Sequence, residues 1–111
     1  MDAATRQFVE TRARGRCEYC RIPQTAVSAR FYVEHIIAQQ HLINDGPENL
    51  ALSCDRCNFN KGPNLSSIDV DSSEIVVLFH PRRDTWQDHF VMHGAMIVGR
   101  TPAGRATVRL L

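Results

Sequence analysis

The stretch that decides the fold runs from Phe31 to Lys61 and reads FYVEHIIAQQHLINDGPENLALSCDRCNFNK. It opens within Ala29–Ile37, where aromatic and β-branched residues predict a strand that ends at a Glu-His pair. The segment His41–Glu48 contains the turn signal Asn-Asp-Gly-Pro and predicts a loop. Leu50–Ser53 predicts a second, short apolar strand. The two strands should form a hairpin with a long connection, which in a small domain often serves a function.

Two Cys-x-x-Cys pairs accompany this stretch: Cys17 with Cys20 before it, and Cys54 with Cys57 beside an expected short helix, Asp55–Lys61. A tetrahedral Zn²⁺ site takes four soft ligands, and each such turn supplies two of them. The alternative, four buried free thiols, does not account for the recurrence of the same spacing. Because no export signal is recognised, we expect a reducing compartment and no disulfides. The cysteines therefore predict a structural zinc site.

The bulk composition is that of a globular protein. A length of 111 residues favours one domain, and 43% hydrophobic with 23% charged residues is ordinary for a soluble chain. No apolar run is long enough to span a bilayer and no signal peptide is recognised, so we expect a cytoplasmic location. The net charge of +1 gives no strong nucleic-acid signal.

Three motifs resemble the HNH endonuclease family, in the branch held by two Cys-x-x-Cys zinc knuckles: VEHII (Val33–Ile37), ENLALSC (Glu48–Cys54) and CNFNKG (Cys57–Gly62). The resemblance covers about half of the chain and fixes residue types at several separated positions. It implies an α+β fold with a small ββα-metal (His-Me finger) core, over residues 15–63, stapled by the four-cysteine zinc site. An N-terminal helix precedes this core, and a C-terminal strand and helix extension follows it over residues 64–111. We expect a single HNH nuclease domain over residues 1–111.

The same resemblance implies catalytic roles. His35 is the general base that takes a proton from the attacking water, a function suited to a histidine at neutral pH. Asn49 fixes the loop and orients His35. Lys61, one helical turn after Asn58, reaches a phosphate.

The resemblance also implies a second, catalytic metal. Glu34 and Asn58 bind a divalent cation (Mg²⁺, Mn²⁺ or another) through side-chain oxygens, which are hard ligands of the type these ions prefer. His41 and Arg56 are candidate substrate contacts. The implied reaction is hydrolysis of double-stranded DNA, by a monomer or a homodimer. One tension remains, because adjacent strand residues point to opposite faces, so Glu34 and His35 share a site only if the strand ends or bulges there.

Each of these residues has a purely structural alternative. His35 would be a hydrogen-bonded strand histidine, Asn49 a turn residue, Asn58 a helix-start cap, and Lys61 a solvated helix end. His41 would be a loop histidine without a role. On that view the protein is a non-catalytic zinc-knuckle module that binds nucleic acid or a protein partner.

The flanking segments predict packing elements. Asp2–Arg14 predicts a helix with Asp2 as its cap and Gly15 as its left-handed end. Asn64–Ser73 is polar and predicts turns. Strands are expected at Ile75–Phe79 and Met96–Arg100. A closing helix is expected over Pro102–Leu111, with Thr101 as its cap.

A weaker cluster combines cations with an aromatic residue and comprises His80, Arg82, Arg83, Trp86 and His89. It could hold a nucleic-acid backbone and stack a base. The favoured interpretation is packing, in which Phe79, Trp86 and Phe90 extend the core and the arginines lie on its surface.

Overall fold

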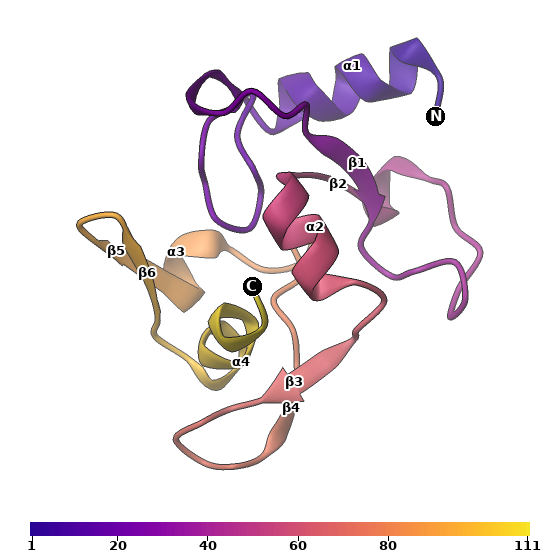
Figure 1. Cartoon of the computed structure of the whole chain (residues 1–111). Helices are drawn as coiled ribbons and strands as arrows, with labels where there is room; N and C mark the ends of the chain where they lie inside the picture. Colours follow the sequence, from indigo (N-terminus) through magenta and orange to yellow (C-terminus); the bar gives the residue numbers. More distant parts are fainter. The chain divides into compact units, whose positions relative to one another are not determined.

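In the computed structural model, which describes residues 1–111, the chain folds as two units, Met1–Gly62 and Pro63–Leu111. The fold is α+β, with four α-helices and three separate two-stranded antiparallel sheets (Figure 1). None of the helices combines the length and the apolar character that a membrane-spanning segment needs.

Helix α1, Ala3–Arg12, begins the first unit where the sequence predicts a helix. The carboxylate of Asp2 caps it by accepting a hydrogen bond from the amide of Thr5 at 2.7 Å. The chain leaves the helix through positive φ angles at Arg14 and Gly15, 55° and 68°, which confirms the left-handed end. From the last turn, the guanidinium of Arg12 donates to the carbonyl of Leu50 at 2.6 Å and so fastens α1 to the hairpin.

The hairpin consists of β1, Tyr32–His35, and β2, Leu50–Ser53, paired with Val33 opposite Leu52. Strand β1 is shorter than the predicted Ala29–Ile37, because β2 offers only four residues to pair with. The 3₁₀ helix η2, Pro47–Asn49, precedes β2 and Cys54 ends it. All four residues of β2 are buried, whereas β1 is buried only at Glu34.

Helix α2, Asp55–Lys61, follows β2 directly and packs on β1, which completes the predicted ββα core. The sulfur of Cys54 caps the helix by accepting from the amide of Cys57 at 3.4 Å. Gly62 ends the helix with φ 51°, as the Gly-Pro sequence predicts. A second 3₁₀ helix, η1, spans Gln24–Ala26 between α1 and the hairpin.

The second unit contains more strands than the sequence predicts. Its elements are β3 (Ser66–Ile68), β4 (Ile75–Val77), α3 (Trp86–His89), β5 (Phe90–His93), β6 (Met96–Gly99) and α4 (Pro102–Leu110). The prediction of turns throughout Asn64–Ser73 is wrong, because Ser66–Ile68 pairs with β4. Strand β5 was not predicted, although it pairs with β6 through a tight turn at Gly94, whose φ is 61°.

The aromatic residues of the second unit form its core. Phe79, Trp86 and Phe90 are buried, and the ring centroids of Phe79 and Phe90 lie 5.1 Å apart. The packing interpretation of this cluster is therefore confirmed. Thr101 caps α4 as predicted, since its hydroxyl accepts from the amide of Gly104 at 3.0 Å.

Asp69 fixes the turn between β3 and β4. Its carboxylate is buried and accepts hydrogen bonds from the guanidinium of Arg105 on α4, at 2.7 and 3.1 Å. The hydroxyl of Ser72 adds a third bond at 2.8 Å. These bonds lower the pKa of Asp69 below its ordinary value, with Arg105 as the main cause. A bidentate pair of this kind links α4 to the β3–β4 hairpin.

Candidate metal centre and catalytic cluster

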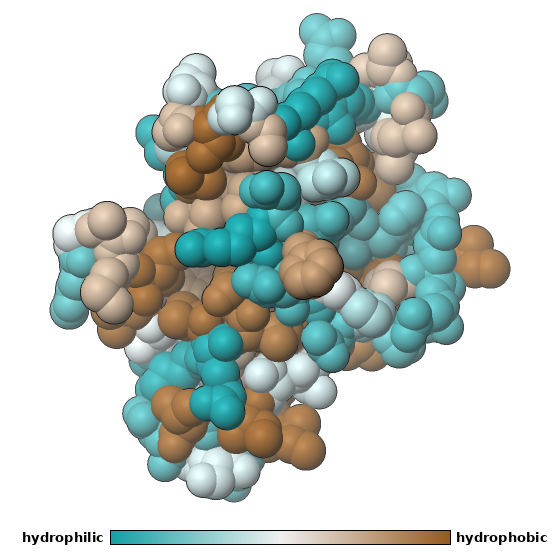
Figure 2. Space-filling model, in the orientation of Figure 1, coloured by the Kyte–Doolittle hydropathy of each residue, from teal (hydrophilic) through white to brown (hydrophobic).

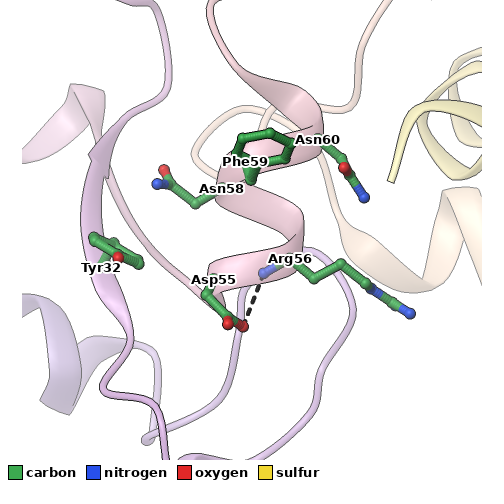
Figure 3. A pocket seen from close by; sticks show the side chains of 6 residues that line it. All are labelled: Tyr32, Asp55, Arg56, Asn58, Phe59 and Asn60. Carbon is green, nitrogen blue, oxygen red and sulfur yellow. Dashed lines mark hydrogen bonds between the residues drawn. The ribbon is translucent and has the colours of Figure 1, made fainter.

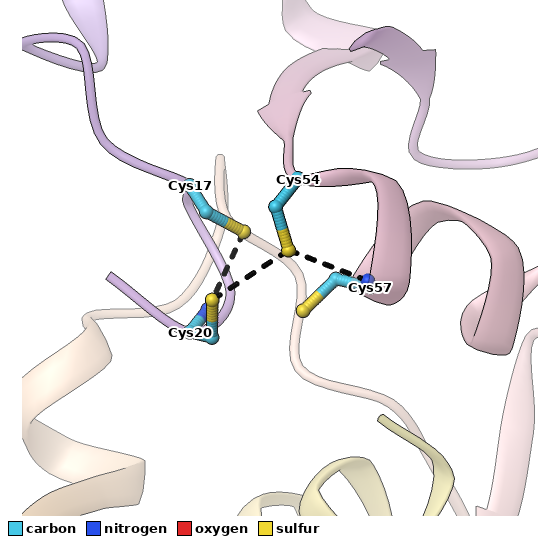
Figure 4. A group of neighbouring side chains, drawn as sticks. All are labelled: Cys17, Cys20, Cys54 and Cys57. Carbon is cyan, nitrogen blue, oxygen red and sulfur yellow. Dashed lines mark hydrogen bonds between the residues drawn. The ribbon is translucent and has the colours of Figure 1, made fainter. Parts of the chain in front are cut away.

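The four cysteines converge on one point, as the sequence predicts. Cys17 and Cys20 come from the segment after α1, and Cys54 and Cys57 from the start of α2, and all four sulfurs turn toward a common centre (Figure 4). Their Sγ atoms lie within 4.8 Å of one another, and those of Cys20 and Cys54 are 3.7 Å apart. Zn²⁺ bound at about 2.3 Å separates its sulfur ligands by about 3.8 Å, so this cluster has the size of a tetrahedral zinc site.

The thiol chemistry also fits a metal. No disulfide forms among the four residues. Hydrogen bonds from neighbouring thiols, that of Cys17 first, hold the pKa of Cys54 well below its usual range. The pKa of Cys17 falls to about 6, chiefly through its bond with Cys20. Hydrogen bonds with neighbouring thiols, that of Cys17 first, raise the pKa of Cys20 and of Cys57. Two of the four sulfurs therefore favour the thiolate form without a metal, and Zn²⁺, which binds thiolates, would favour it at all four.

Main-chain bonds connect this cluster to the hairpin. Within the first pair, the amide of Cys20 donates to the sulfur of Cys17 at 3.5 Å. Glu18 then binds β2 twice: its amide donates to the carbonyl of Leu52 at 2.9 Å, and its carboxylate accepts from the amide of Leu52 at 2.8 Å. The segment that carries the first cysteine pair is therefore hydrogen-bonded directly to β2.

His35 lies at the end of β1, with 22% of its side chain exposed. Its Nε2 is 2.7 Å from Oδ1 of Asp45, in the loop between the strands. Gln39 donates to the same oxygen at 3.2 Å. The bond from His35 is the main reason that the pKa of Asp45 lies below its ordinary value. An ionised Asp45 only accepts hydrogen bonds, so Nε2 carries a proton, and in the neutral ring Nδ1 then presents its lone pair.

Asp45 is a site residue that the sequence did not reveal. In the sequence it belongs to Asn-Asp-Gly-Pro, a pattern that predicts a turn and conceals any further use of the carboxylate. Only the folded loop brings it to His35, from ten positions along the chain.

Asn49 holds the loop from inside. The side chain is 3% exposed and makes three hydrogen bonds to the main chain. Its Oδ1 accepts from the amide of Ile37 at 2.9 Å, and its Nδ2 donates to the carbonyls of Ile37 and Asn44 at 3.0 and 2.9 Å. These bonds connect the beginning of the loop, at Ile37, to its end, at Asn44 and Asn49. Because Ile37 lies two residues after His35, they also restrain the main chain beside the histidine.

Glu34 points inward from β1, which ends at the next residue, His35. It is 7% exposed, and its Oε1 has no hydrogen-bond partner although it is fully buried. Burial raises the pKa of Glu34 to about 7, against the opposing influence of Lys61 and of the Tyr19 hydroxyl. A buried carboxylate oxygen without a partner is costly unless a proton or a cation satisfies it. This oxygen therefore fits a metal ligand.

Lys61 belongs to the same buried region. It is 3% exposed, and its Nζ donates to the carbonyl of Ile36 at 2.8 Å. The alternative of a solvated helix end is therefore wrong. In this structure the ammonium group lies inside the unit, near Glu34, and is not presented at the surface.

Asn58 projects from α2 toward β1 (Figure 3). It lines an open hollow of about 460 Å³ together with Tyr32, Asp55, Arg56, Phe59 and Asn60. The alternative of a helix-start cap is wrong, since Cys54 occupies that position. No hydrogen bond joins the side chain of Asn58 to Glu34 or His35 in this structure.

The two candidate substrate contacts lie on the surface. His41 is exposed in the loop and Arg56 is exposed on α2. Figure 2 shows hydrophilic groups over much of the visible face, with hydrophobic groups among them. The most exposed large hydrophobic residues of the first unit are Ile43 and Phe59, at 85% and 84%.

Comparison with known proteins gives one family. Residues 17–64 match the sequence profile of the HNH endonuclease family. The match begins at the first zinc-knuckle cysteine and includes the whole ββα core. No curated protein sequence matches the chain significantly, and no solved structure does so.

Proposed function

Because residues 17–64 of this chain are an HNH endonuclease domain, we propose that the protein is a metal-dependent endonuclease that hydrolyses phosphodiester bonds in DNA. HNH domains act on nucleic acids, and the four-cysteine cluster supports a zinc-bound form of this fold. The observation that carries the proposal is the half-buried imidazole of His35, bound through Nε2 to Asp45 at 2.7 Å.

In this proposal His35 is the general base. Asp45 accepts a hydrogen bond from Nε2–H and so keeps the Nδ1 lone pair of the neutral ring available, and Nδ1 has no partner within the chain. The lone pair takes a proton from the water that attacks phosphorus. A positioned base of this kind contributes about 10²–10⁴-fold to the rate. Asn49 keeps the loop, and with it Asp45, at a fixed place beside the ring.

Glu34 and Asn58 are the proposed ligands of the catalytic divalent cation. The partnerless Oε1 of Glu34 and the uncommitted side-chain amide oxygen of Asn58 are both hard oxygen donors. Asn58 projects from α2 toward β1, the strand that carries Glu34. When bound, the cation would stabilise negative charge on the phosphate and on the leaving oxygen. Lys61 contributes by lowering the pKa of Glu34, which favours the ionised carboxylate that a cation needs.

A non-catalytic zinc-knuckle module that binds nucleic acid or protein is the second candidate. The observation that favours it is Lys61 itself, because a buried ammonium group gives Glu34 a counter-charge without any metal. On this view the Glu34–Lys61 pair belongs to the core, and His35 with Asp45 only closes the loop.

The experiment is plasmid nicking by the zinc-loaded protein, with Mg²⁺ or Mn²⁺ added. The wild type should relax supercoiled DNA, and His35→Ala should lower the nicking rate by about 10²–10⁴-fold while it still binds DNA. His93→Ala is the matched control, since His93 is an exposed histidine at the end of β5, and it should keep full activity. DNA binding without nicking, in every metal, would favour the module.

A further inference from the structure

The hollow beside Asn58 contains two exposed aromatic side chains. Phe59 is 84% exposed and Tyr32 is 51% exposed, and both line the same hollow from α2 and β1. Figure 3 shows Tyr32 on the strand, Phe59 on the outer side of the helix, and Asn58 between them. Leaving a phenylalanine in water forgoes about 2 kcal/mol of burial, and here a second exposed ring, that of Tyr32, lines the same hollow.

The polar residues of the hollow are not committed to the protein. The side chains of Arg56, Asn58 and Asn60 make no hydrogen bond or ion pair within the chain. Asp55 differs, because its carboxylate accepts from the main-chain amide of Arg56 at 2.9 Å and so belongs to the start of the helix. The hollow therefore offers two aromatic surfaces, one free guanidinium group and two free amides.

These groups match the chemistry of a nucleotide. Exposed aromatic rings stack on bases, amide side chains bond to base edges, and an arginine binds phosphate. The volume of about 460 Å³ lies within the range of sites for small ligands. In a duplex, neighbouring bases cover each other's faces, so a ring can stack only on a base that has left the helix or was never paired.

We infer that Tyr32 and Phe59 form a stacking subsite for an unstacked nucleobase, with Arg56 on the adjoining phosphate. The inference rests on the proposed function, since Asn58 is both part of the hollow and a proposed ligand of the catalytic cation. It deepens that function by naming the substrate class: a nucleic acid with an unpaired nucleotide beside the cleaved bond.

The experiment measures binding in the full-length, zinc-loaded His35→Ala protein, so that no cleavage occurs. The probes are a fluorescein-labelled single-stranded DNA, the RNA of the same sequence, and the DNA duplex. We expect tighter binding to the single strands than to the duplex at equal salt. Adding Phe59→Ala should weaken single-strand binding by about tenfold, the loss typical of one base-stacking ring, and should leave duplex binding unchanged. Phe59→Trp should restore it.

Ile43→Ala is the matched control, because Ile43 is a hydrophobic residue with the same exposure, 85%, outside the hollow. It should not alter binding to any probe. A DNA single strand with 2-aminopurine provides a direct reading, since stacking on Phe59 should quench its fluorescence and Phe59→Ala should release that quenching. The ratio of the affinities for the RNA and for the DNA single strand shows which of the two nucleic acids the subsite prefers.

Three results would overturn the subsite: no single-strand binding by the wild type, equal losses for Phe59→Ala and Ile43→Ala, or equal losses for single strand and duplex. Each is independent of cleavage. If nicking fails but stacking holds, the protein binds unpaired bases without cutting them. If nicking holds and stacking fails, the nuclease remains and the hollow has no part in substrate choice.

Discussion

The cysteine centre and the candidate catalytic cluster occupy the same ββα core but are built in opposite ways. The cluster comprises Glu34, His35, Asp45, Asn58 and Lys61. The centre uses four identical side chains whose Sγ atoms lie within 4.8 Å of one another, and it needs only a metal to be complete. The cluster uses single residues of different types from β1, α2 and the loop, and its members bond to separate neighbours. We therefore expect the cysteine centre to stabilise the fold, and the candidate catalytic cluster to depend on that fold for its geometry.

The two sites should therefore contribute with opposite sign to the free energy of unfolding. Closing a four-cysteine site binds two distant chain segments together, so its loss should be felt as unfolding. The buried oxygen of Glu34 acts in the opposite direction, because an unsatisfied charge in the interior destabilises the folded state. We expect the cysteine centre, once it binds zinc, to offset this destabilisation in a core of this size.

The strongest test of the comparison is Cys54→Ser. Removing one thiolate should release zinc and unfold the HNH domain, since a structural zinc contributes about 10–16 kcal/mol and a whole domain is stable by only about 5–15 kcal/mol. Elemental analysis should give one zinc per wild-type chain and none for the variant, and circular dichroism should show the loss of structure.

Ser53→Ala provides the control for that experiment. Ser53 is fully buried beside the ligand, and its hydroxyl donates to the carbonyl of Cys54 at 3.1 Å. Its removal keeps all four thiols and should cost about 1 kcal/mol. A wild-type protein that is well folded without zinc would contradict the structural role of the centre.

A smaller effect is expected from Glu34→Gln. Burial raises the pKa of Glu34 to about 7 from its ordinary 4.5, so the folded chain retains a proton that the unfolded chain releases. The free energy of unfolding should therefore fall as the pH rises from 4.5 to about 7, by about 3 kcal/mol in total. Glutamine imitates the protonated acid, so the variant should be more stable than the wild type at pH 8 and similar to it near pH 5.

Urea unfolding at the two pH values measures this difference. Glu74→Gln removes the same charge from an exposed turn and should leave the pH dependence of the wild type in place. Adding Mn²⁺ at pH 8 should stabilise the wild type more than Glu34→Gln, because a carboxylate binds the ion more tightly than a neutral amide oxygen does. Equal pH dependence in both proteins would show that the carboxyl of Glu34 is not isolated from water.

Much of the first unit follows from its sequence because its signals are local. Strand β2, helix α2 and the cysteine cluster were all predicted, since short-range patterns specify each of them. The second unit was predicted less well. Strand β3 has the sequence Ser-Ser-Ile, which carries little strand preference, and it forms because β4 provides a partner.

The contacts of the catalytic cluster depend on tertiary structure and could not be predicted. The sequence contains both His35 and Asp45, but a loop conformation fixed by Asn49 is needed to bring them within 2.7 Å. Likewise, the sequence places Lys61 at a helix end, where solvent is the usual neighbour, and only the packing of α2 on β1 buries it. Contacts across a loop or between two elements produce no periodic pattern in the sequence from which they could be predicted.

The smallest effect is expected from Asp45→Asn, which alters the candidate catalytic cluster and leaves the four cysteines intact. Asparagine can donate to Nε2, so the ring proton should move to Nδ1 and occupy the position that accepts a proton from water. We expect the nicking kcat to fall by about 10–100-fold with little change in KM, as is typical when a supporting residue is lost.

Two further measurements separate orientation from stability in that variant. A ¹H–¹⁵N spectrum of the His35 ring should show the proton on Nε2 in the wild type and on Nδ1 in Asp45→Asn. Gln39→Ala removes the other hydrogen bond to Asp45, at 3.2 Å, without touching the ring, and should change kcat by less than about threefold. Asp45→Glu should restore part of the activity, since a carboxylate again accepts from Nε2. The same tautomer in the wild type and in Asp45→Asn, with kcat unaltered, would make Asp45 a turn residue and nothing more.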